Sequence, residues 1–386
     1  MGRRSYTRAG YDRTGCARRD RWEEGKRMAK KSDGRRLRVG VLGCGPIAQA
    51  AHLESAAKAR NVDLYAICEV ADDLRERMAC AYSPQKTYRD YDEMLSDPDL
   101  EAVVIATADA FHVSASLAAL RAGKDVLCEK PLGVSVEEVE ELGRTVRESG
   151  RVLQVGHMKR YDAGLQSARA FIDSEMGECL ALKAWYCDST HRYEVTDALQ
   201  PLIVTSERAK RPTSDPKSDH ARYFMLAHGS HLLDTARYLG GEIVEVDARL
   251  RERFGAYCWF VDVAFRGGVL GHLDLTVAVR MDWHEGFQIY GEHGSVIGKT
   301  YNPWLFKTSE VDIFHEATGT TSRVLGADGH FYRRQLEGFA DAALGRAPLT
   351  GASVDDGIAS VRGMVAVARS VRSGRPVRLG EVAGGL

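Results

Sequence analysis

The sequence predicts an α/β protein in two parts, a doubly wound parallel sheet in the first half and a strand-rich α/β part in the second. Three observations support this prediction. A Gly-rich turn at 43–48 separates a strand from a helix, strands alternate with helices up to residue 155, and strand-like runs joined by turns follow from residue 178. A length of 386 residues suits two such domains better than one.

The composition is that of an ordinary globular chain, with 44% hydrophobic and 28% charged residues and a formal net charge of −1. No apolar run approaches the roughly 18 residues that cross a bilayer, so we expect no membrane segment. The cysteines are scattered without a C-x-x-C pair, and Cys68 and Cys128 lie inside apolar runs. This usage indicates reduced packing residues and a cytoplasmic protein.

Residues 1–36 form a basic head that shows no hydrophobic periodicity. Thirteen Lys or Arg residues stand against five Asp or Glu in this stretch. We expect a disordered extension, or an overlong start with Met28 as the true initiator. A nucleic-acid-binding arm is the alternative, because Tyr6, Tyr11 and Trp22 are interleaved with the basic residues. We assign the head no function and expect no nucleic-acid partner.

The first strand, residues 37–42, leads into the turn Gly43-Cys44-Gly45-Pro46-Ile47-Ala48, a G-x-G-x-x-A pattern. Gly43 permits the tight turn, Gly45 lets a pyrophosphate approach the backbone, and Ala48 still allows close helix–strand packing. Pro46 suits the first helical turn, where its missing N–H costs nothing. The free N–H groups and the dipole of this helix start attract phosphate. The turn therefore predicts a dinucleotide site.

The second strand, at residues 62–70, ends beside Glu69, which follows Gly45 by 24 residues. A carboxylate at this point accepts hydrogen bonds from the hydroxyls of the adenosine ribose and repels a 2′-phosphate. NAD is therefore the expected cofactor. NADP is the alternative, because Arg75 and Arg77 follow within two helical turns.

The alternation continues with strands at 101–108, 124–130 and 151–156 and with helices at 112–123 and 135–150. The second of these helices begins with a Ser135-x-x-Glu138 capping box. Strands that alternate with helices imply a parallel sheet with right-handed crossovers. We therefore assign residues 37–155 to a dinucleotide-binding domain of the Rossmann type.

The second half contains strand-like runs at 178–187, 243–254, 258–279 and 285–298. Hairpin-style turns interrupt two of these runs, at 266–268 and at 292–294. A final helix is predicted to begin at a Ser353-x-x-Asp356 cap and to end at Gly374. These runs support a second α/β domain at residues 156–386.

The stretch "LAHGSHLLDTARYLGG" at 226–241 places His228, His231 and Asp234 at three-residue intervals, along one edge of a helix. Two imidazoles and a carboxylate suit acid–base chemistry, and they also suit zinc or non-haem iron. The three groups span about 9 Å along a helix, which is long for a single ion. We favour the acid–base interpretation and expect no metal.

The stretch "CEKPLG" at 128–133 is more specific to one protein family than the Gly-rich turn is by itself. With "VGVLGCGPIA", "GHMKRYD", "HGSHLLDTARYLGG" and the closing residues 353–379, it resembles the Gfo/Idh/MocA family of NAD(P)-dependent oxidoreductases, which includes glucose–fructose oxidoreductase and inositol dehydrogenase. The resemblance implies a Rossmann domain followed by an α/β domain with a large, open, mostly antiparallel sheet. It also implies that residues 156–386 bind substrate and form a homo-oligomer, a dimer or a tetramer.

The resemblance gives Lys130 and His231 the catalytic roles. In similar enzymes the lysine of Glu129-Lys130-Pro131 contacts the reacting oxygen beside the nicotinamide, where a cation stabilises an alkoxide. Pro131 excludes helical angles at Lys130 and can make a cis bond. His231 is then the general base. Family members carry an aspartate at the position of Ala227, and His228 is a candidate substitute contact.

The resemblance also suggests roles for Asp234, His112, Arg160 and Tyr161. Asp234 is expected to support its helix or to orient His231. His112 either caps its helix or lines the nicotinamide pocket. Arg160 and Tyr161 at the domain junction are expected to contact substrate, together with Lys130, His228 and His231. The expected cofactor site comprises Gly43, Cys44, Gly45, Pro46, Ile47, Glu69, Ala106, Thr107, Ala108, His112, Glu129 and Lys130. Lower-ranked pocket candidates are His191, Tyr193, Trp283 and His284.

The resulting hypothesis is an NAD-dependent dehydrogenase. It transfers hydride between nicotinamide and a secondary alcohol or ketone of a sugar, cyclitol or glycoside. Two alternatives stay open: a glycoside-cleaving enzyme that uses transient oxidation by bound NAD, and a non-catalytic NAD-binding regulator on the same fold. The presence of Lys130 and His231 favours catalysis, whereas Ala227 favours the regulator.

Overall fold

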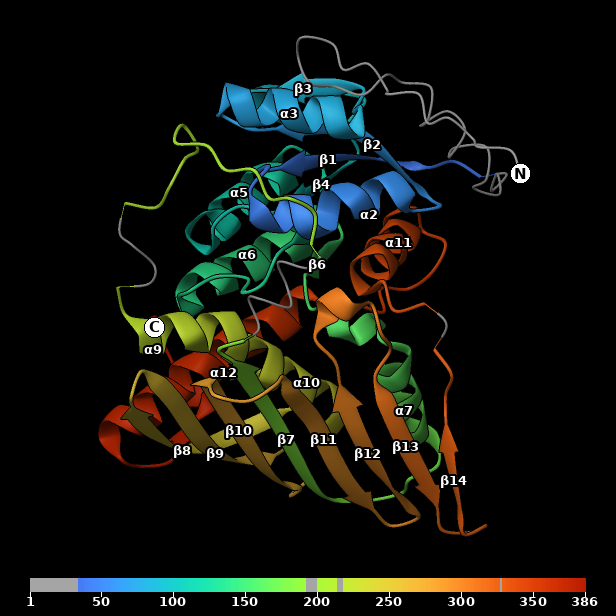
Figure 1. The fold of residues 1–386 in the computed structure, drawn as a ribbon, viewed down its shortest axis with the longest axis vertical. Coiled ribbons are helices and arrows are strands. Elements are labelled where there is room, and N and C mark those ends of the chain that lie inside the picture. The colour runs from blue at the N-terminus through green and yellow to red at the C-terminus, as the bar shows by residue number, and fades with distance from the viewer. Residues whose placement is uncertain (1–33, 192–199, 214–217, 327) are drawn as a thin grey trace, which may run out of the picture.

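The computed structural model describes residues 34–191, 200–213, 218–326 and 328–386. The basic head up to residue 33 and Tyr193 lie outside the described residues. Two sheets, one from each half of the chain, form separate layers with helices between them (Figure 1). This arrangement confirms the predicted α/β fold. Among the described helices, none is both long and apolar enough to cross a bilayer.

The first sheet is parallel throughout, with the strand order β3-β2-β1-β4-β5-β6. Its strands are β1 (Leu37–Leu42), β2 (Val62–Cys68), β3 (Lys86–Tyr88), β4 (Ala102–Ile105), β5 (Asp125–Cys128) and β6 (Leu153–Val155). The chain order reverses between β1 and β4, so ligands are expected at the carboxyl ends of these two strands. Cys44, Cys68 and Cys128 are buried free thiols in this domain, as predicted, whereas Cys80 is disulfide-bonded, contrary to the prediction.

Helices cover both faces of the first sheet (Figure 1). They are η1 (Ala48–His52), α2 (Leu53–Lys58), α3 (Asp72–Tyr82), α4 (Tyr91–Leu95), η2 (Asp109–Phe111), α5 (His112–Arg121) and α6 (Val136–Ser149). The helix after the Gly-rich turn begins at Pro46, as predicted, and has π-helical geometry over η1. Gly150 ends α6 in the left-handed region, at φ +63°.

The capping box predicted at Ser135 is wrong. Its hydroxyl donates to a carboxylate oxygen of Glu137 at 2.8 Å and accepts no hydrogen bond from the helix backbone. The end of the chain packs against this helix start, and the Val136 N–H donates to the carbonyl of Gly384 at 3.0 Å. A tertiary contact therefore satisfies a donor that a local cap was expected to satisfy.

The second sheet is mixed, with the order β14-β13-β12-β11-β7-β10-β9-β8-β15. Strands β7 and β10 pair in parallel and the other neighbours are antiparallel. Its strands are β7 (Cys179–Ser189), β8 (Ile243–Arg253), β9 (Ala256–Phe265), β10 (Leu270–Val279), β11 (His284–Gly291), β12 (Gly294–Thr300), β13 (Glu310–His315), β14 (Thr320–Arg323) and β15 (Val377–Arg378).

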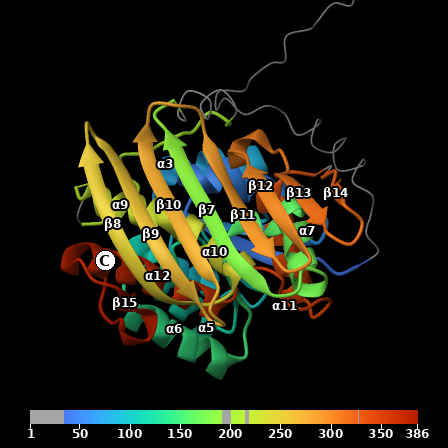
Figure 2. The same ribbon diagram turned by 90° about the horizontal axis from the view of Figure 1, so that it is seen from below.

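One face of this sheet is covered by helices and the other is open (Figure 2). The helices and short turns of the second half are η3 (Met158–Tyr161), α7 (Ala163–Ser174), α9 (His220–Phe224), η4 (Met225–Gly229), α10 (Ser230–Gly240), η5 (Pro303–Leu305), α11 (Phe331–Ala343), α12 (Val354–Ser373) and η6 (Leu379–Glu381). The predicted Ser353–Asp356 capping box is present at the start of α12, and Gly374 ends this helix in the left-handed region.

Two helices of the second half of the chain also pack against the Rossmann part. Leu336, Phe339 and Ala340 of α11 are buried in the core of the first sheet, and α12 packs against α6 as well as β8. The chain passes from the first sheet to the second between β6 and β7. Because α11 and α12 return to the Rossmann part, the junction is a broad interface, and the site described next lies in it.

Candidate active site

A cavity of about 710 Å³ lies at the carboxyl ends of β1, β2 and β4. Gly43 and Gly45 line it and explain why the turn needs glycine. Gly43 has φ +87°, and a Cβ there would lie 3.0 Å from the Ala106 carbonyl oxygen. A Cβ on Gly45 would meet no protein atom within 4 Å, so the backbone at Gly45 faces open space. A pyrophosphate can approach this backbone closely.

Glu69 lines the same cavity and is buried. One of its carboxylate oxygens accepts the Cys44 N–H at 2.9 Å, and the other accepts the Ala71 N–H at 3.0 Å. These bonds fix the carboxylate beside the turn, and its remaining lone pairs can accept ribose hydroxyls. Arg75 donates to the Glu69 carbonyl oxygen at 2.7 Å, so this guanidinium is held on the backbone.

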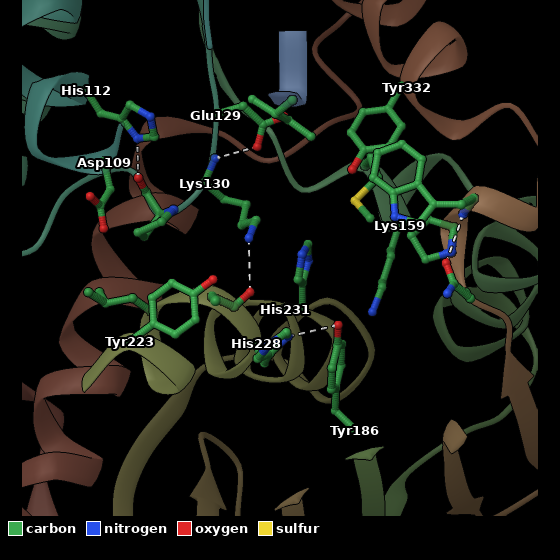
Figure 3. A pocket seen from close by; sticks show the side chains of 18 of the residues that line it. Asp109, His112, Glu129, Lys130, Lys159, Tyr186, Tyr223, His228, His231 and Tyr332 are labelled. Atoms are coloured by element: carbon green, nitrogen blue, oxygen red, sulfur yellow. Dashed lines mark hydrogen bonds between the residues drawn. The ribbon is translucent and has the colours of Figure 1, made fainter. Parts of the chain in front are cut away.

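A second cavity, of about 390 Å³, adjoins the first, and Ile47 and Thr107 line both. Lys130 and His231 face it from opposite parts of the junction (Figure 3). Its volume lies in the range of small-molecule sites. Aromatic rings form much of its wall: Tyr186, Tyr223, Trp283, Trp304 and Tyr332.

Lys130 lies two residues beyond the end of β5, and its peptide bond to Pro131 is cis. Its ammonium crosses to the second domain and donates to the carbonyl oxygen of Ala227 at 3.0 Å (Figure 3). Behind it, the carboxylate of Glu129 accepts the Lys130 N–H at 3.1 Å and lies 2.7 Å from Nε2 of the buried His52. The segment that carries the lysine is therefore tied to the helix after the Gly-rich turn.

His231 is buried at the centre of the second cavity (Figure 3). Its ring lies parallel to that of Tyr186, with centroids 6.2 Å apart. Burial lowers the pKa of His231 well below its usual value, and the charges of Lys130 and Lys159 lower it further. The imidazole is therefore neutral at neutral pH, which is the form that accepts a proton.

The three residues of the His-x-x-His-x-x-Asp stretch do not converge on one point. His228, in the π-helical turn η4, lies 3.3 Å from the Tyr186 hydroxyl and 3.3 Å from Asp188. Asp234 turns away from the cavity and binds Arg160. Within the described ranges, no group of three His, Cys, Asp or Glu side chains is placed to hold a metal ion.

Comparison with known proteins agrees with this geometry. A family model described as "Oxidoreductase family, NAD-binding Rossmann fold" matches residues 37–157, and its companion for the "C-terminal alpha/beta domain" matches residues 212–379. The chain belongs to the Gfo/Idh/MocA family of oxidoreductases. Residues 37–157 are thus the NAD-binding Rossmann domain of this family, and NAD is the cofactor.

The similarity to individual proteins is distant. Inositol 2-dehydrogenase 2 of Saccharopolyspora erythraea is 29% identical over 348 residues, which cover 88% of this chain and 94% of that protein. Inositol 2-dehydrogenase of Salmonella typhimurium is 28% identical over 173 residues, 44% of this chain, and the match spans about half of that relative, 52%. The structure of levoglucosan dehydrogenase with NADH and levoglucosan has a TM-score of 0.72 at 21% identity, covering 90% of this chain and all of that one (100%).

Most of the predicted cofactor residues line one of the two cavities. The larger cavity is lined by Gly43, Gly45, Pro46, Ile47, Glu69, Ala106, Thr107 and Ala108. Glu129, Lys130 and His112 line the smaller cavity, where the nicotinamide end of a dinucleotide would lie. The ring nitrogens of His112 lie 2.7 Å from the Pro131 carbonyl oxygen and 3.1 Å from that of Thr107. Cys44 does not line either cavity, because its side chain is buried in the domain core.

Arg160 and Tyr161, which were expected to contact substrate, have protein partners instead. Neither residue lines the cavity. Arg160 is buried and donates to both oxygens of Asp234, at 2.7 and 3.1 Å, and Tyr161 donates to Gln154 at 2.9 Å. A charged residue at a domain junction is as easily satisfied by a buried partner as by a ligand. Trp283 does line the cavity, whereas His191 and His284 are exposed and do not.

Sequence reasoning missed Lys159, the neighbour of Arg160. Lys159 points into the cavity (Figure 3), with its ammonium 4.4 Å from the centroid of the Tyr186 ring. It forms a buried ion pair with Glu285 of β11. "GHMKRYD" contained the residue, but no local signal distinguished a lysine that faces the cavity from an arginine that faces the core.

Proposed function

We propose that this chain is an NAD-dependent dehydrogenase acting on a secondary alcohol, or the corresponding ketone, of a sugar or cyclitol. The observation that carries the proposal is the pairing of the Lys130 ammonium with the neutral imidazole of His231 on one cavity that adjoins the NAD site.

Bound NAD supplies the hydride acceptor. The protein residues handle the oxygen and its proton. Lys130 directs a positive charge at the alcohol oxygen and stabilises the alkoxide that develops as the C–H bond breaks. His231, uncharged because it is buried among cations, removes the hydroxyl proton. In the reverse direction, the same imidazole returns the proton to the ketone oxygen.

The walls of the cavity support a ring-shaped polyol. Aromatic faces of Tyr223, Trp283 and Trp304 offer apolar surface to the C–H face of a sugar or cyclitol, while Lys159 and His228 offer hydrogen bonds to hydroxyls. The inositol dehydrogenases and levoglucosan dehydrogenase named above act on such compounds according to their names.

The proposal is tested by following reduced nicotinamide absorbance with a panel of cyclitols, sugars and anhydrosugars. Lys130→Met and His231→Asn should each lower kcat by about 100-fold or more. Lys58→Met, which removes an exposed lysine at the end of α2, is the matched control and should retain wild-type turnover. The proposal would be overturned if the wild-type protein bound NADH but reacted with no compound of the panel. The variants must bind NADH as tightly as the wild type in this comparison.

We also propose a cytoplasmic homo-oligomer that buries the open face of the second sheet. That face exposes large apolar side chains on β9 to β13, namely Phe260, Leu270, Tyr290, Ile297 and Phe314. Contiguous apolar surface on a sheet indicates an interaction site. Phe260→Glu combined with Ile297→Glu should shift the mass measured by light scattering to the monomer. A wild-type monomer at micromolar concentration would contradict this assembly.

A further inference from the structure

A segment from the second half of the chain forms part of the wall of the NAD cavity. Residues 204–212 lie between β7 and α9 in sequence, yet this segment runs beside the Rossmann domain (yellow-green in Figure 1). It contributes Val204, Thr205, Ser206, Ala209, Lys210, Arg211 and Pro212 to the larger cavity. We call residues 204–212 the strap.

One attachment of the strap is made by Gln49, in the π-helical turn that follows the Gly-rich turn. Its buried carboxamide accepts the Val204 N–H at 2.9 Å and donates to the Val204 carbonyl at 2.8 Å. The same amide nitrogen donates to the carbonyl of Cys44 at 2.8 Å. One side chain therefore links the strap directly to the turn that holds pyrophosphate.

The second attachment lies on α3. The Ser206 hydroxyl donates to the carboxylate of Asp73 at 2.8 Å, and Ser206 is buried although its neighbours Thr205 and Glu207 are exposed. This bond lowers the pKa of Asp73, so the carboxylate stays charged and the bond persists near neutral pH. The strap is thus fixed to two helices that flank the dinucleotide cavity.

The strap also brings positive charge to the cavity. Lys210 and Arg211 both line it, and the Lys210 ammonium lies 4.9 Å from the ring centroid of Phe111, which lines the cavity from the other side. Lysine and arginine side chains at such a wall attract the phosphates of a dinucleotide, and salt screens this attraction when they are exposed.

We infer that the strap closes over bound NAD and that its two attachments must open before the cofactor leaves. The Gly-rich turn and Glu69 form one side of the cavity and the strap forms another, so a dinucleotide in the cavity is enclosed between them. The strap is also continuous in sequence with α9, η4 and α10, which carry His228 and His231. Opening of the strap for cofactor exchange therefore involves the chain segment that leads to the helices beside the substrate cavity.

The experiment measures the dissociation rate of NADH from the full chain by its fluorescence, after addition of excess NAD and without substrate. Ser206→Ala removes one attachment and should raise the rate about fivefold. Gln49→Leu removes the bonds at Val204 and Cys44 and should raise it about tenfold or more. Ser174→Ala, which removes an exposed hydroxyl at the end of α7, is the matched control and should leave the rate unchanged.

A double-mutant cycle isolates the second attachment. Because Ser206 and Asp73 bond to each other, Asp73→Ala and the double variant should accelerate release no more than Ser206→Ala alone. Lys210→Ala combined with Arg211→Ala should weaken NADH binding about threefold at low salt and less at 1 M salt.

The outcomes are decisive even if one variant does not fold. If Gln49→Leu unfolds, Ser206→Ala and its cycle still test the strap. Unchanged NADH dissociation in folded Ser206→Ala and Asp73→Ala proteins would overturn the inference and make the strap a fixed wall. The NADH measurement uses no substrate, so it tests the strap independently of the proposed function. If the variants release NADH faster but the protein oxidises no sugar, the inference about the strap stands and only the proposed function fails.

Discussion

The Lys130 ammonium donates a hydrogen bond to the backbone carbonyl of Ala227, and the two residues come from different domains. The resemblance to family members led us to expect a carboxylate side chain at residue 227. In this chain the backbone of η4 supplies the acceptor, so the lysine is anchored across the junction without an acidic neighbour at that position. Ala227 lines the smaller cavity, and its methyl group occupies less of this cavity than a carboxylate side chain would, which leaves more room for a ligand.

This geometry predicts the effect of restoring the acid. Ala227→Asp keeps the backbone acceptor and adds a carboxylate to the wall of the cavity. We expect KM for the substrate found with the panel to rise about tenfold, because the larger charged side chain occupies space that the ligand uses. NADH affinity should stay within about twofold, since residue 227 does not line the larger cavity. Ala227→Ser is the control for size without charge, and an unchanged KM in both variants would contradict the reasoning.

The environment of His231 predicts the pH dependence of the reaction. Its pKa is lowered by burial and by Lys130 and Lys159, so the imidazolium is disfavoured and the neutral base persists into acidic solution. In the direction of alcohol oxidation, kcat/KM should therefore remain level as pH falls through 6.5, the usual value for histidine, and should decline only below it. Lys159→Met removes one of the cations and should move this acid limb toward higher pH. A wild-type limb at or above pH 6.5 would refute the assignment.

The parts of the site that sequence predicts best are those set by local backbone geometry. Gly43 and Gly45 line the larger cavity as expected, because a left-handed φ and an open approach each require glycine and the pattern is read within six residues. Lys130 lines the smaller cavity as expected, because it lies just beyond the end of a buried strand and ligands bind at the carboxyl ends of parallel strands. His231 followed from the spacing of its motif in the family resemblance.

The parts that sequence did not predict depend on distant partners. Glu285 pairs with Tyr186 across β11 and β7, and Lys159 lies over the Tyr186 ring, so Glu285 meets Lys159 although the two are 126 positions apart. The strap is a second example, since Gln49 and Val204 are 155 positions apart. At Ser135 a correct local pattern was overridden by the packing of Gly384 at the same helix start. The hydrophobic periodicity of a single segment carries no information about contacts of this kind.

We expect the buried pair of Lys159 and Glu285 to stabilise the fold and Lys159 also to contact substrate, and variants can separate these two roles. Burial lowers the pKa of Lys159 and raises that of Glu285, and each charge offsets the effect on the other. Lys159→Met leaves a buried carboxylate without its cation and should lower the free energy of unfolding by about 3–5 kcal/mol, measured by urea denaturation.

The double variant Lys159→Met with Glu285→Gln removes both charges and should recover most of this stability. Its KM should nevertheless stay about tenfold above wild type, because the ammonium that faces the cavity is still missing. A stable double variant with wild-type KM would show that the pair is structural and that Lys159 does not contact substrate.

Asp234 is the carboxylate of the motif that carries His231. Asp234 binds Arg160 through both oxygens, and Arg160 also contacts Asp356 at 3.0 Å. The guanidinium thereby joins η3, α10 and the start of α12, and it fixes the helix on which His231 lies. Asp234→Asn should lower the free energy of unfolding by about 3–5 kcal/mol, since the buried Arg160 loses its bidentate partner.

The same variant should reduce kcat while it leaves the acid limb of the pH profile in place, because Asp234 positions the helix and does not exchange the proton. NADH dissociation should be unchanged, since Asp234 lies outside the NAD cavity. Glu242→Gln breaks the exposed pair with Arg266 and is the matched control, with an expected loss below about 1 kcal/mol. If Asp234→Asn moved the acid limb and left stability intact, the carboxylate would instead act on the titration of His231, and the role assigned to Arg160 would be wrong.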